Sequence, residues 1–561
     1  MPMNRIHPSL ILSLSFLATS LIINASEEPK NWGKLSGSFE SNTIIYQEDS
    51  KTGAEAPSPI YGSHNYLTLN YNYNKWSAGI QLEYIPQVLE GYEKRMQGLG
   101  MPTKFVSYNH QQFSVTVGDY YEQLGSGLVL RLWEDRQLGI NNSALGARAT
   151  FNTKNQDITA KVMFGIPRNY LRSEGAGYKL GQNFFDSYSD TKFYAADVSL
   201  SLLDLINLDS SHRVSVETSG LYRFANKIPK NWGYLVDPDG GYRFNLNDPT
   251  YSYSLRMSYE FGSFSLKGEY AFKSEDIYLN PKTYDHELKS GNAQLVELNY
   301  ALAGFTAAAA FRRLENMDSP IYYSDQVFAA NTMNYLPALA QMQTYLLATH
   351  HPYSTLGQGE IGGQLDLFYR FKRNSFLGGR YGMKVHLNAS CYYALEEALS
   401  NYEEDRLAYQ DLNLSIERSW NKKLKSNLFY SHQKYSPDKG NTDKFYTQDI
   451  VVADLLYELT RKISLRGELQ YLFCDDQEDK DWMAGVLEAN FSPHWSIYIS
   501  DMYNHGNTKE HYYSVGVNYT KGIARIGAVY GRNREGMVCS GGVCRMQPAY
   551  TGGNIQLSLI F

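Results

Sequence analysis

The chain has 561 residues, of which 43% are hydrophobic and 14% aromatic, and tyrosine alone contributes 47 residues. Lys and Arg total 52 against 58 Asp and Glu, and this net charge of −6 argues against a nucleic-acid-binding protein, which would carry a strongly basic surface. With 20% charged residues and so many aromatic ones, the composition also argues against an intrinsically disordered chain.

The first 25 residues have the pattern of a cleaved export signal. Arg5 and His7 precede an apolar stretch at 10–23, and the small residue Ala25 follows. We therefore predict a signal peptide that is cleaved near Ala25. A membrane anchor is the alternative, but serine and threonine interrupt the stretch, which is shorter than the roughly 20 apolar residues of a spanning helix. No later segment is long and apolar enough for such a helix, which leaves a secreted soluble protein or a membrane β-barrel.

Apolar and polar residues alternate in many segments along the chain, for example at 67–73, 264–272, 412–416 and 463–473. Successive side chains of a strand point to opposite faces, so each segment has one apolar and one polar face. A soluble sandwich would share this alternation. Many of these segments, however, run for about 10 to 14 residues, whereas soluble strands usually have about 5 or 6 and a tilted membrane strand needs about 9 to 11. The polar residues that we expect to face a lumen are Lys267, Glu269, Asp411, Glu417, Arg466 and Glu468.

Short and long links alternate between these segments. Short links fall at positions such as 74–75, 110–111, 420 and 521–522, and longer polar links at positions such as 47–63, 122–142 and 315–357. Bacterial outer-membrane barrels combine short periplasmic turns with longer outer loops and an even number of strands. We therefore predict an all-β fold, a large transmembrane antiparallel barrel of about 24 strands that occupies residues 26–561 as a single domain, with both termini in the periplasm.

The segment 118–142 is the densest in charge and glycine. Its charged residues could form a constriction or a docking site for a partner, or they could be a salt-bridged brace inside the lumen. The candidates are Asp119, Glu122, Arg131, Glu134, Asp135 and Arg136.

The longest link, 315–357, contains a predicted helix from Pro337 to Thr349, since proline is well tolerated in a first helical turn. Leu339, Met342, Leu346 and Leu347 would form its apolar stripe. This helix could fold into the lumen or cap the mouth of the barrel. His350 and His351 follow without a third ligand nearby, so we assign no metal.

Cys539 and Cys544 are close in sequence and are separated by a segment that includes Gly541 and Gly542. In an exported protein this spacing predicts a disulfide. Cys391 and Cys474 could also pair, but the sequence does not show it. The acidic run at 475–481 is either a solvated loop or a calcium site, and it lacks the spacing of an EF-hand.

The last strand is the most specific single feature. Ile555, Leu557 and Leu559 alternate with polar residues, and Phe561 ends the sequence. This resembles the terminal strand of outer-membrane barrels, whose final aromatic residue is read by the barrel-assembly machinery. We expect this strand to close the barrel against a first strand near 34–46.

Two blocks, 118–142 and 534–545, resemble an uncharacterised family of outer-membrane barrels of Bacteroidota, porin-like and of unknown function. The resemblance implies the same barrel fold. It brings no assigned activity, so no catalytic residue can be carried over to this chain.

Barrels of 16–18 strands leave a channel and those of 22 usually need a plug, so a barrel this large is either open or filled by its loops or by another protein. The leading hypothesis is a porin-like channel with a loop-restricted lumen. The alternatives are a non-catalytic barrel subunit of a larger export or barrel-assembly complex, and a surface hydrolase. Hydrolase motifs are absent, so we expect no enzyme and no cofactor. The expected partners are outer-membrane lipid and lipopolysaccharide, the barrel-assembly machinery and other envelope proteins, with no nucleic acid.

Overall fold

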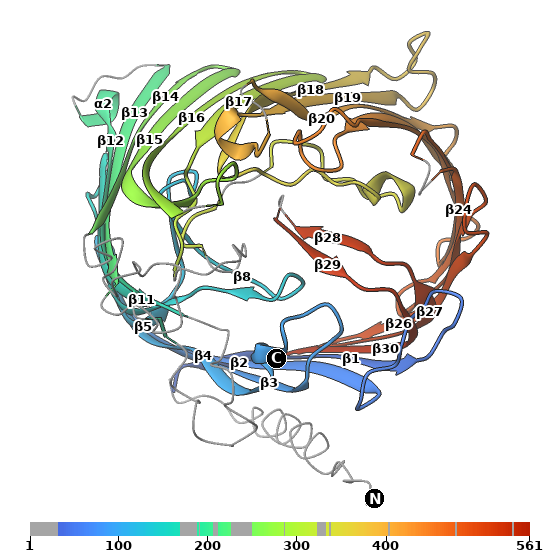
Figure 1. Cartoon of the computed structure of the whole chain (residues 1–561), viewed down its shortest axis with the longest axis horizontal. Helices are drawn as coiled ribbons and strands as arrows, with labels where there is room; N and C mark the ends of the chain where they lie inside the picture. Colours follow the sequence, from blue (N-terminus) through green and yellow to red (C-terminus); the bar gives the residue numbers. More distant parts are fainter. Residues whose placement is uncertain are drawn as a thin grey trace, which may run out of the picture.

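A computed structural model describes residues 32–168, 188–189, 191–205, 211–225, 249–284, 286–321, 332–335, 338–401, 404–476, 480–540 and 543–561. The predicted signal peptide at 1–25 lies outside this range. Twenty-four strands form one antiparallel sheet that closes on itself, as the alternating pattern predicted (Figure 1). Each strand pairs with its neighbours in sequence, and the last strand pairs with the first.

The strands of the barrel are long, as crossing a bilayer requires. They are β1 (Lys34–Gln47), β2 (Tyr61–Tyr73), β3 (Trp76–Gln87), β4 (Gly98–Asn109), β5 (Phe113–Tyr120), β10 (Ala144–Asn152), β11 (Ile158–Pro167), β12 (Thr191–Ser201), β13 (His212–Ala225), β14 (Thr250–Phe261), β15 (Phe264–Leu279), β16 (His286–Leu302), β17 (Phe305–Glu315), β18 (Gly359–Phe371), β19 (Met383–Ala394), β20 (Arg406–Ser419), β21 (Leu424–Tyr435), β22 (Tyr446–Glu458), β23 (Ile463–Cys474), β24 (Trp482–Phe491), β25 (Trp495–Asn504), β26 (His511–Lys521), β27 (Ala524–Asn533) and β30 (Tyr550–Ile560).

The remaining elements lie in the links. Three two-stranded hairpins pair β6 (Glu122–Leu124) with β7 (Leu130–Leu132), β8 (Glu134–Asp135) with β9 (Ile140–Asn141), and β28 (Gly536–Ser540) with β29 (Val543–Gln547). The helical turns are η1 (Lys94–Met96), α2 (Leu202–Leu205), η4 (Leu347–Thr349) and η5 (Glu396–Ala398). Within the described ranges, no helix has the length and apolar character needed to cross a membrane.

The two faces of the barrel wall differ in chemistry, as strand alternation requires. On β23, Leu469 is 71% exposed on the outer face, whereas its neighbours Glu468 and Gln470 are buried on the inner face. Hydrogen bonding explains the closure: a sheet edge facing hydrocarbon would leave backbone groups without partners.

The barrel closes between β30 and β1. Ser38 to Gln47 pair in register with Ile560 to Thr551. Beyond this ladder, the backbone N–H of Gly37 donates to the Phe561 carbonyl at 2.7 Å, and the Phe561 N–H donates back at 2.9 Å. A Cβ on Gly37 would lie 2.6 Å from the Thr68 carbonyl oxygen and 2.9 Å from the ring of Phe561, so a side chain at position 37 would clash with both.

Candidate functional site

Three links fold inward from the same end of the barrel, the end that carries the long links. They are residues 121–143 after β5, the described parts of 316–358 between β17 and β18, and the described parts of 534–549, which contain β28 and β29. In Figure 1, β8, β28 and β29 lie inside the ring of strands. The candidate functional site therefore lies in the lumen.

The first two inward links are joined by backbone hydrogen bonds. The N–H of Arg131 donates to the Met333 carbonyl at 2.7 Å, and the N–H of Tyr335 donates to the Gly127 carbonyl at 3.0 Å. Asn142 Nδ2 adds a bond to the Thr332 carbonyl at 2.8 Å. We call residues 121–143 together with the described part of 316–335 the inner plug.

Apolar side chains hold the inner plug against one wall of the barrel. Leu124, Leu128 and Leu130 of the plug are buried in one cluster with inner-face residues of the wall such as Phe193 and Leu314. This inverts the usual arrangement of a wide barrel, whose inner face is polar. Burial of each leucine contributes about 1.5–3 kcal/mol, so the cluster is a substantial attachment.

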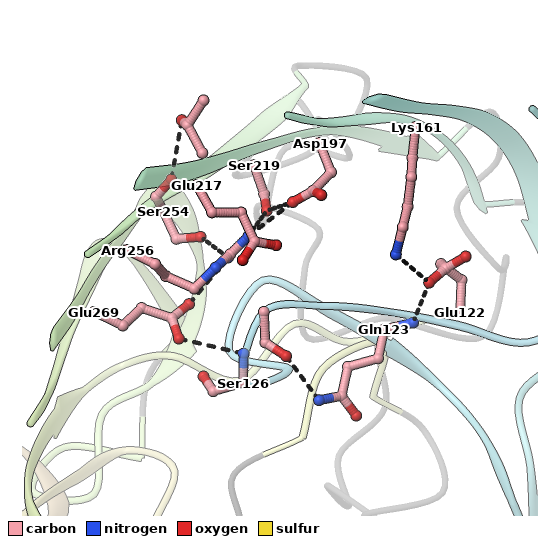
Figure 2. A network of polar contacts seen from close by, with 12 residues as sticks. Glu122, Gln123, Ser126, Lys161, Asp197, Glu217, Ser219, Ser254, Arg256 and Glu269 are labelled. Atoms are coloured by element: carbon pink, nitrogen blue, oxygen red, sulfur yellow. Dashed lines mark hydrogen bonds and ion pairs between the residues drawn. The ribbon is translucent and has the colours of Figure 1, made fainter. Parts of the chain in front are cut away.

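A polar network fixes the tip of the β6–β7 hairpin to the same wall (Figure 2). Arg256 of β14 lies 2.7 Å from Asp197 and 3.4 Å from Glu269 and also pairs with Glu217. The other oxygen of Glu269 accepts the backbone N–H of Ser126 at 3.3 Å. A Cβ on Gly125 would fall within 2.2 Å of Arg256, and φ there is +54°, so the tip fits the guanidinium only as glycine.

The remaining charged residues predicted in segment 118–142 mostly brace this plug. Glu122 pairs with Arg148 at 2.9 Å and Lys161 at 3.1 Å. Arg131 lies over the ring of Tyr335, with 3.8 Å between guanidinium carbon and ring centroid. Asp135 accepts the backbone N–H of Leu138 at 3.0 Å and so caps a turn.

Two residues of that segment have other surroundings. Glu134 accepts a hydrogen bond from Gln81 at 2.8 Å and holds Arg136 at 3.2 Å, and Arg136 reaches Glu40 of β1 at 2.7 Å. Asp119 does not face the lumen. It shares a face of β5 with the outward Val115 and Val117, and Lys104 (3.0 Å) and Tyr188 (2.6 Å) cover it there. The register of β5 decides which face Asp119 occupies, and the glycine and charge content of the block did not indicate that register.

The six residues predicted on strand inner faces lie on those faces, as their alternation requires. Glu417 pairs with Lys384 at 2.8 Å, and Asp411 is buried with hydrogen bonds from Ser390 and Asn413. Arg466 pairs with Asp454 and with Glu468. Lys267 is exposed near the short turn after β14, and Glu269 belongs to the Arg256 network.

The predicted helix at 337–349 is wrong for the residues that the structure describes. From 338 to 346 the chain is irregular, and only η4 is helical. Wall side chains take the backbone hydrogen bonds that a helix would have formed internally: Tyr392 donates to the Leu339 carbonyl, and Gln470 accepts the N–H of Leu347 at 3.0 Å. We call residues 338–351 the strap.

The end of the strap is buried against β21–β24. Leu347 is in a cluster with Phe429 and Trp482. His350 stands edge-on to Trp482, with 4.8 Å between ring centroids, and no described group bonds to either ring nitrogen. Burial, with smaller contributions from Arg534 and His351, lowers the pKa of His350 well below its ordinary value of 6.5.

The β28–β29 hairpin is closed by the predicted disulfide between Cys539 and Cys544. Cys391 and Cys474 are not joined to each other. The hairpin rests on other inward segments: Arg545 lies 3.9 Å from the ring centroid of Tyr92, and its Nε donates to the Gln137 carbonyl at 2.8 Å.

A cavity of about 840 Å³ remains between the inner plug, the strap, the β28–β29 hairpin and the wall at β27, β30 and β1. Its lining runs from residues beside the short turn after β26 to residues at the start of the hairpin. Charged and amide residues of the lining are Glu40, Asn42, Arg136, Gln137, Asn518, Arg525, Asn533, Arg534, Glu535, Arg545, Gln547, Asn554 and Gln556.

Of the predicted lumen candidates, only Arg136 lines this cavity. Sequence reasoning missed Arg525 and Arg545. The alternation of Ile526, Ala528 and Tyr530 could have placed Arg525 on the inner face of β27. No sequence pattern near these arginines could show which part of the barrel wall the loops leave uncovered. In the described ranges no three His, Cys, Asp or Glu residues are arranged to hold a metal ion.

A family model described as "Family of unknown function (DUF6029)" matches residues 4–561. No curated protein matches the chain significantly. The fold is similar to the P pilus usher (PapC) translocation pore, with 9% identity, a TM-score of 0.45, and coverage of 94% of this chain and 99% of that one. A ferric enterobactin receptor (PfeA) mutant from Pseudomonas aeruginosa gives 10% identity, a TM-score of 0.41 and coverage of 94% and 81%. The siderophore receptor PirA from Acinetobacter baumannii has 9% identity and a TM-score of 0.40, with coverage of 95% of this chain and 81% of that one.

Proposed function

We propose that this chain, which belongs to the DUF6029 family of unknown function, is an outer-membrane channel of the porin-like type with a loop-restricted lumen. The observation that carries the proposal is the cavity along β27, β30 and β1. Its lining includes Arg525 and Ser558 near the short turns and Glu535 and Val538 near the long links, so it extends along the wall.

The division of the lumen supports the proposal. The inner plug is held by apolar burial and by the Arg256 network, whereas the cavity wall carries amides and charged side chains among apolar ones. A barrel of this size would otherwise enclose a wide aqueous pore. The plug reduces that pore to a narrow path, which favours selective passage of small solutes over the passage of folded proteins.

We orient the barrel with its short turns and both termini in the periplasm, because outer-membrane barrels place their long loops outside. The outer apolar face then contacts lipid, and the long-link end contacts lipopolysaccharide. Insertion would use the barrel-assembly machinery, with Phe561 as the residue that is read. The proposal assigns no catalytic step to any residue.

Current through a planar lipid bilayer tests the proposal. Purified protein that retains its barrel, shown by heat-modifiable migration on SDS gels, is added to a bilayer in symmetric 1 M KCl, roughly the salt at which surface charges are screened. We expect discrete conductance steps that are smaller than those of an open porin. The matched control is the same preparation after heat unfolding. A folded protein that gives no steps would contradict the channel and favour a non-conducting subunit of a larger complex.

A further inference from the structure

Two arginines of the cavity have no carboxylate partner among the residues that the structure describes. Arg525 is exposed on the inner face of β27, opposite Ser558 of β30. Arg545 of β29 donates to the Gln137 carbonyl and the Gln547 side chain, each at 2.8 Å, and also contacts Tyr92. The charge of each guanidinium is therefore not offset by an ion pair.

Several other arginines of the lumen are paired with carboxylates, whereas Arg131 stacks on the ring of Tyr335. Arg256, Arg466 and Arg148 each pair with one or more carboxylates. In the cavity itself, Arg136 is offset by Glu40 at 2.7 Å and by Glu134 at 3.2 Å. The cavity thus holds two arginines without a described carboxylate partner, and its lining carboxylates are Glu40, which pairs with Arg136, and Glu535.

The two arginines lie at opposite ends of the cavity. Arg525 is the second residue of β27, next to the short turn, whereas Arg545 belongs to the hairpin that folds in from the long-link end. Neutral amides of the wall, such as Asn42, Asn554 and Gln556, lie between them. A narrow, low-dielectric passage focuses the field of such fixed charges and raises the local concentration of ions of opposite sign.

We propose that the cavity is selective for anions and that Arg525 and Arg545 are two successive binding positions for small oxyanions, such as phosphate and short carboxylates. The planar guanidinium donates two parallel hydrogen bonds to such groups, which a point charge cannot do. Amide side chains between the two positions donate further bonds without trapping the ion. This inference rests on the proposed channel function and specifies what the channel passes.

The reversal potential in a KCl gradient tests the selectivity. In the unmodified protein, we expect a reversal potential whose sign shows preference for anions. Arg525→Gln lowers the anion-to-cation permeability ratio by about threefold or more, since one of the two focusing charges is lost. Arg525→Lys keeps the ratio within about twofold because the charge is retained. Inorganic phosphate added to one side reduces the chloride current of the parent, and less so that of Arg525→Lys, which lacks the bidentate donor.

Lys267→Gln is the matched control. Lys267 is a cation on an inner face beside a short turn, as Arg525 is, but it does not line the cavity. Its loss leaves the reversal potential unchanged. Cation preference in the parent, or equal effects of Arg525→Gln and Lys267→Gln, would overturn the inference while the channel itself stands. Folded protein without current would overturn both.

Discussion

Asp49 and Arg532, which lie 483 positions apart in sequence, form a two-pronged ion pair across the barrel seam. Arg532 Nε is 2.6 Å from Oδ2 of Asp49 and Nη2 is 3.1 Å from Oδ1, and both side chains are only about one-tenth exposed. Thr551 of β30 donates to the same carboxylate at 2.8 Å. The link after β1 is thus tied to the last two strands of the barrel.

Asp49→Asn weakens this closure. Burial alone would raise the pKa of Asp49, but hydrogen bonds from Arg532 and Thr551 outweigh it and hold the pKa below its ordinary value. The carboxylate therefore stabilises the fold above about pH 4, and this contribution is lost as pH falls through the lowered pKa. We expect a loss of about 1.5–3 kcal/mol at pH 7, measured as a lower temperature for loss of the fast-migrating form on SDS gels.

The control for this prediction is Lys51→Met. Lys51 pairs with Glu510 at 3.6 Å, but its side chain is 62% exposed, so its removal changes stability by about 0.5 kcal/mol or less. If Asp49→Asn and Lys51→Met have the same small effect, the seam pair does not stabilise the barrel.

Arg256→Met releases the inner plug. The substitution leaves the buried Asp197 and Glu269 and the half-buried Glu217 without their shared cation, which costs about 3–5 kcal/mol. Because Glu269 then repels its neighbours, the hairpin tip at Ser126 detaches, and we expect larger and noisier conductance steps. Lys384→Met, which breaks a half-exposed pair with Glu417 away from the plug, leaves the steps unchanged. Equal conductance in both variants would show that the plug does not restrict the lumen.

Acid loosens the strap. Since the pKa of His350 is lowered by burial, the docked strap binds its proton only at low pH, whereas the undocked strap binds it below about 6.5. Docking is therefore complete above pH 6.5 and weakens as pH falls, by up to about 1.4 kcal/mol per pH unit until the lowered pKa is reached. Limited proteolysis between 338 and 351 should be faster at pH 5 than at pH 7. His350→Phe removes this difference, and an equal difference in that variant would contradict the assignment to His350.

The two faces of the last strand, β30, have different surroundings. Ile555 is 51% exposed in an apolar groove of the outer face, whereas Gln556 lines the cavity. Ile555→Arg places a charge in hydrocarbon at a cost of about 2–4 kcal/mol near the midplane, and we expect less protein in the outer membrane. Gln556→Arg is mild because its side chain faces water. Equal membrane yields of the two variants would contradict a lipid-facing Ile555.

Deleting Phe561 tests the closing contact. The deletion removes both backbone hydrogen bonds to Gly37 and the ring that packs on it. We expect export across the inner membrane to continue while the folded, heat-modifiable fraction falls. Phe561→Tyr keeps the ring and the hydrogen bonds and serves as the control. A normal folded fraction without Phe561 would show that this contact is dispensable for closure.

The barrel could be predicted from sequence because each strand carries its own two-residue period. The alternation at 463–473 gives the two faces of β23 without knowledge of any partner, and the spacing of Cys539 and Cys544 gives their disulfide. The interior could not be predicted in the same way. The position of Gly125 on Arg256, and the strap that replaced a predicted helix, depend on contacts between links that are far apart in sequence.

For the same reason, the charged residues of segment 118–142 mostly proved to pack the plug and did not mark the cavity. Glu122 and Arg131 hold the plug, and only Arg136 of the predicted candidates lines the cavity, whereas Arg525 and Arg545 come from β27 and β29. Arg525 shares β27 with one other charged residue, Arg532, and no charge cluster in the sequence marks it.

Blocking the cavity with a thiol reagent tests the central claim most directly. In a background with Cys391→Ser and Cys474→Ser, Ser558→Cys places a thiol on the cavity lining, and Ser464→Cys places one on the inner face of β23, outside the cavity. We predict that a bulky methanethiosulfonate reagent abolishes most of the bilayer current of Ser558→Cys and leaves that of Ser464→Cys unchanged. Unchanged current in modified Ser558→Cys, with block in Ser464→Cys, would contradict conduction along β27, β30 and β1.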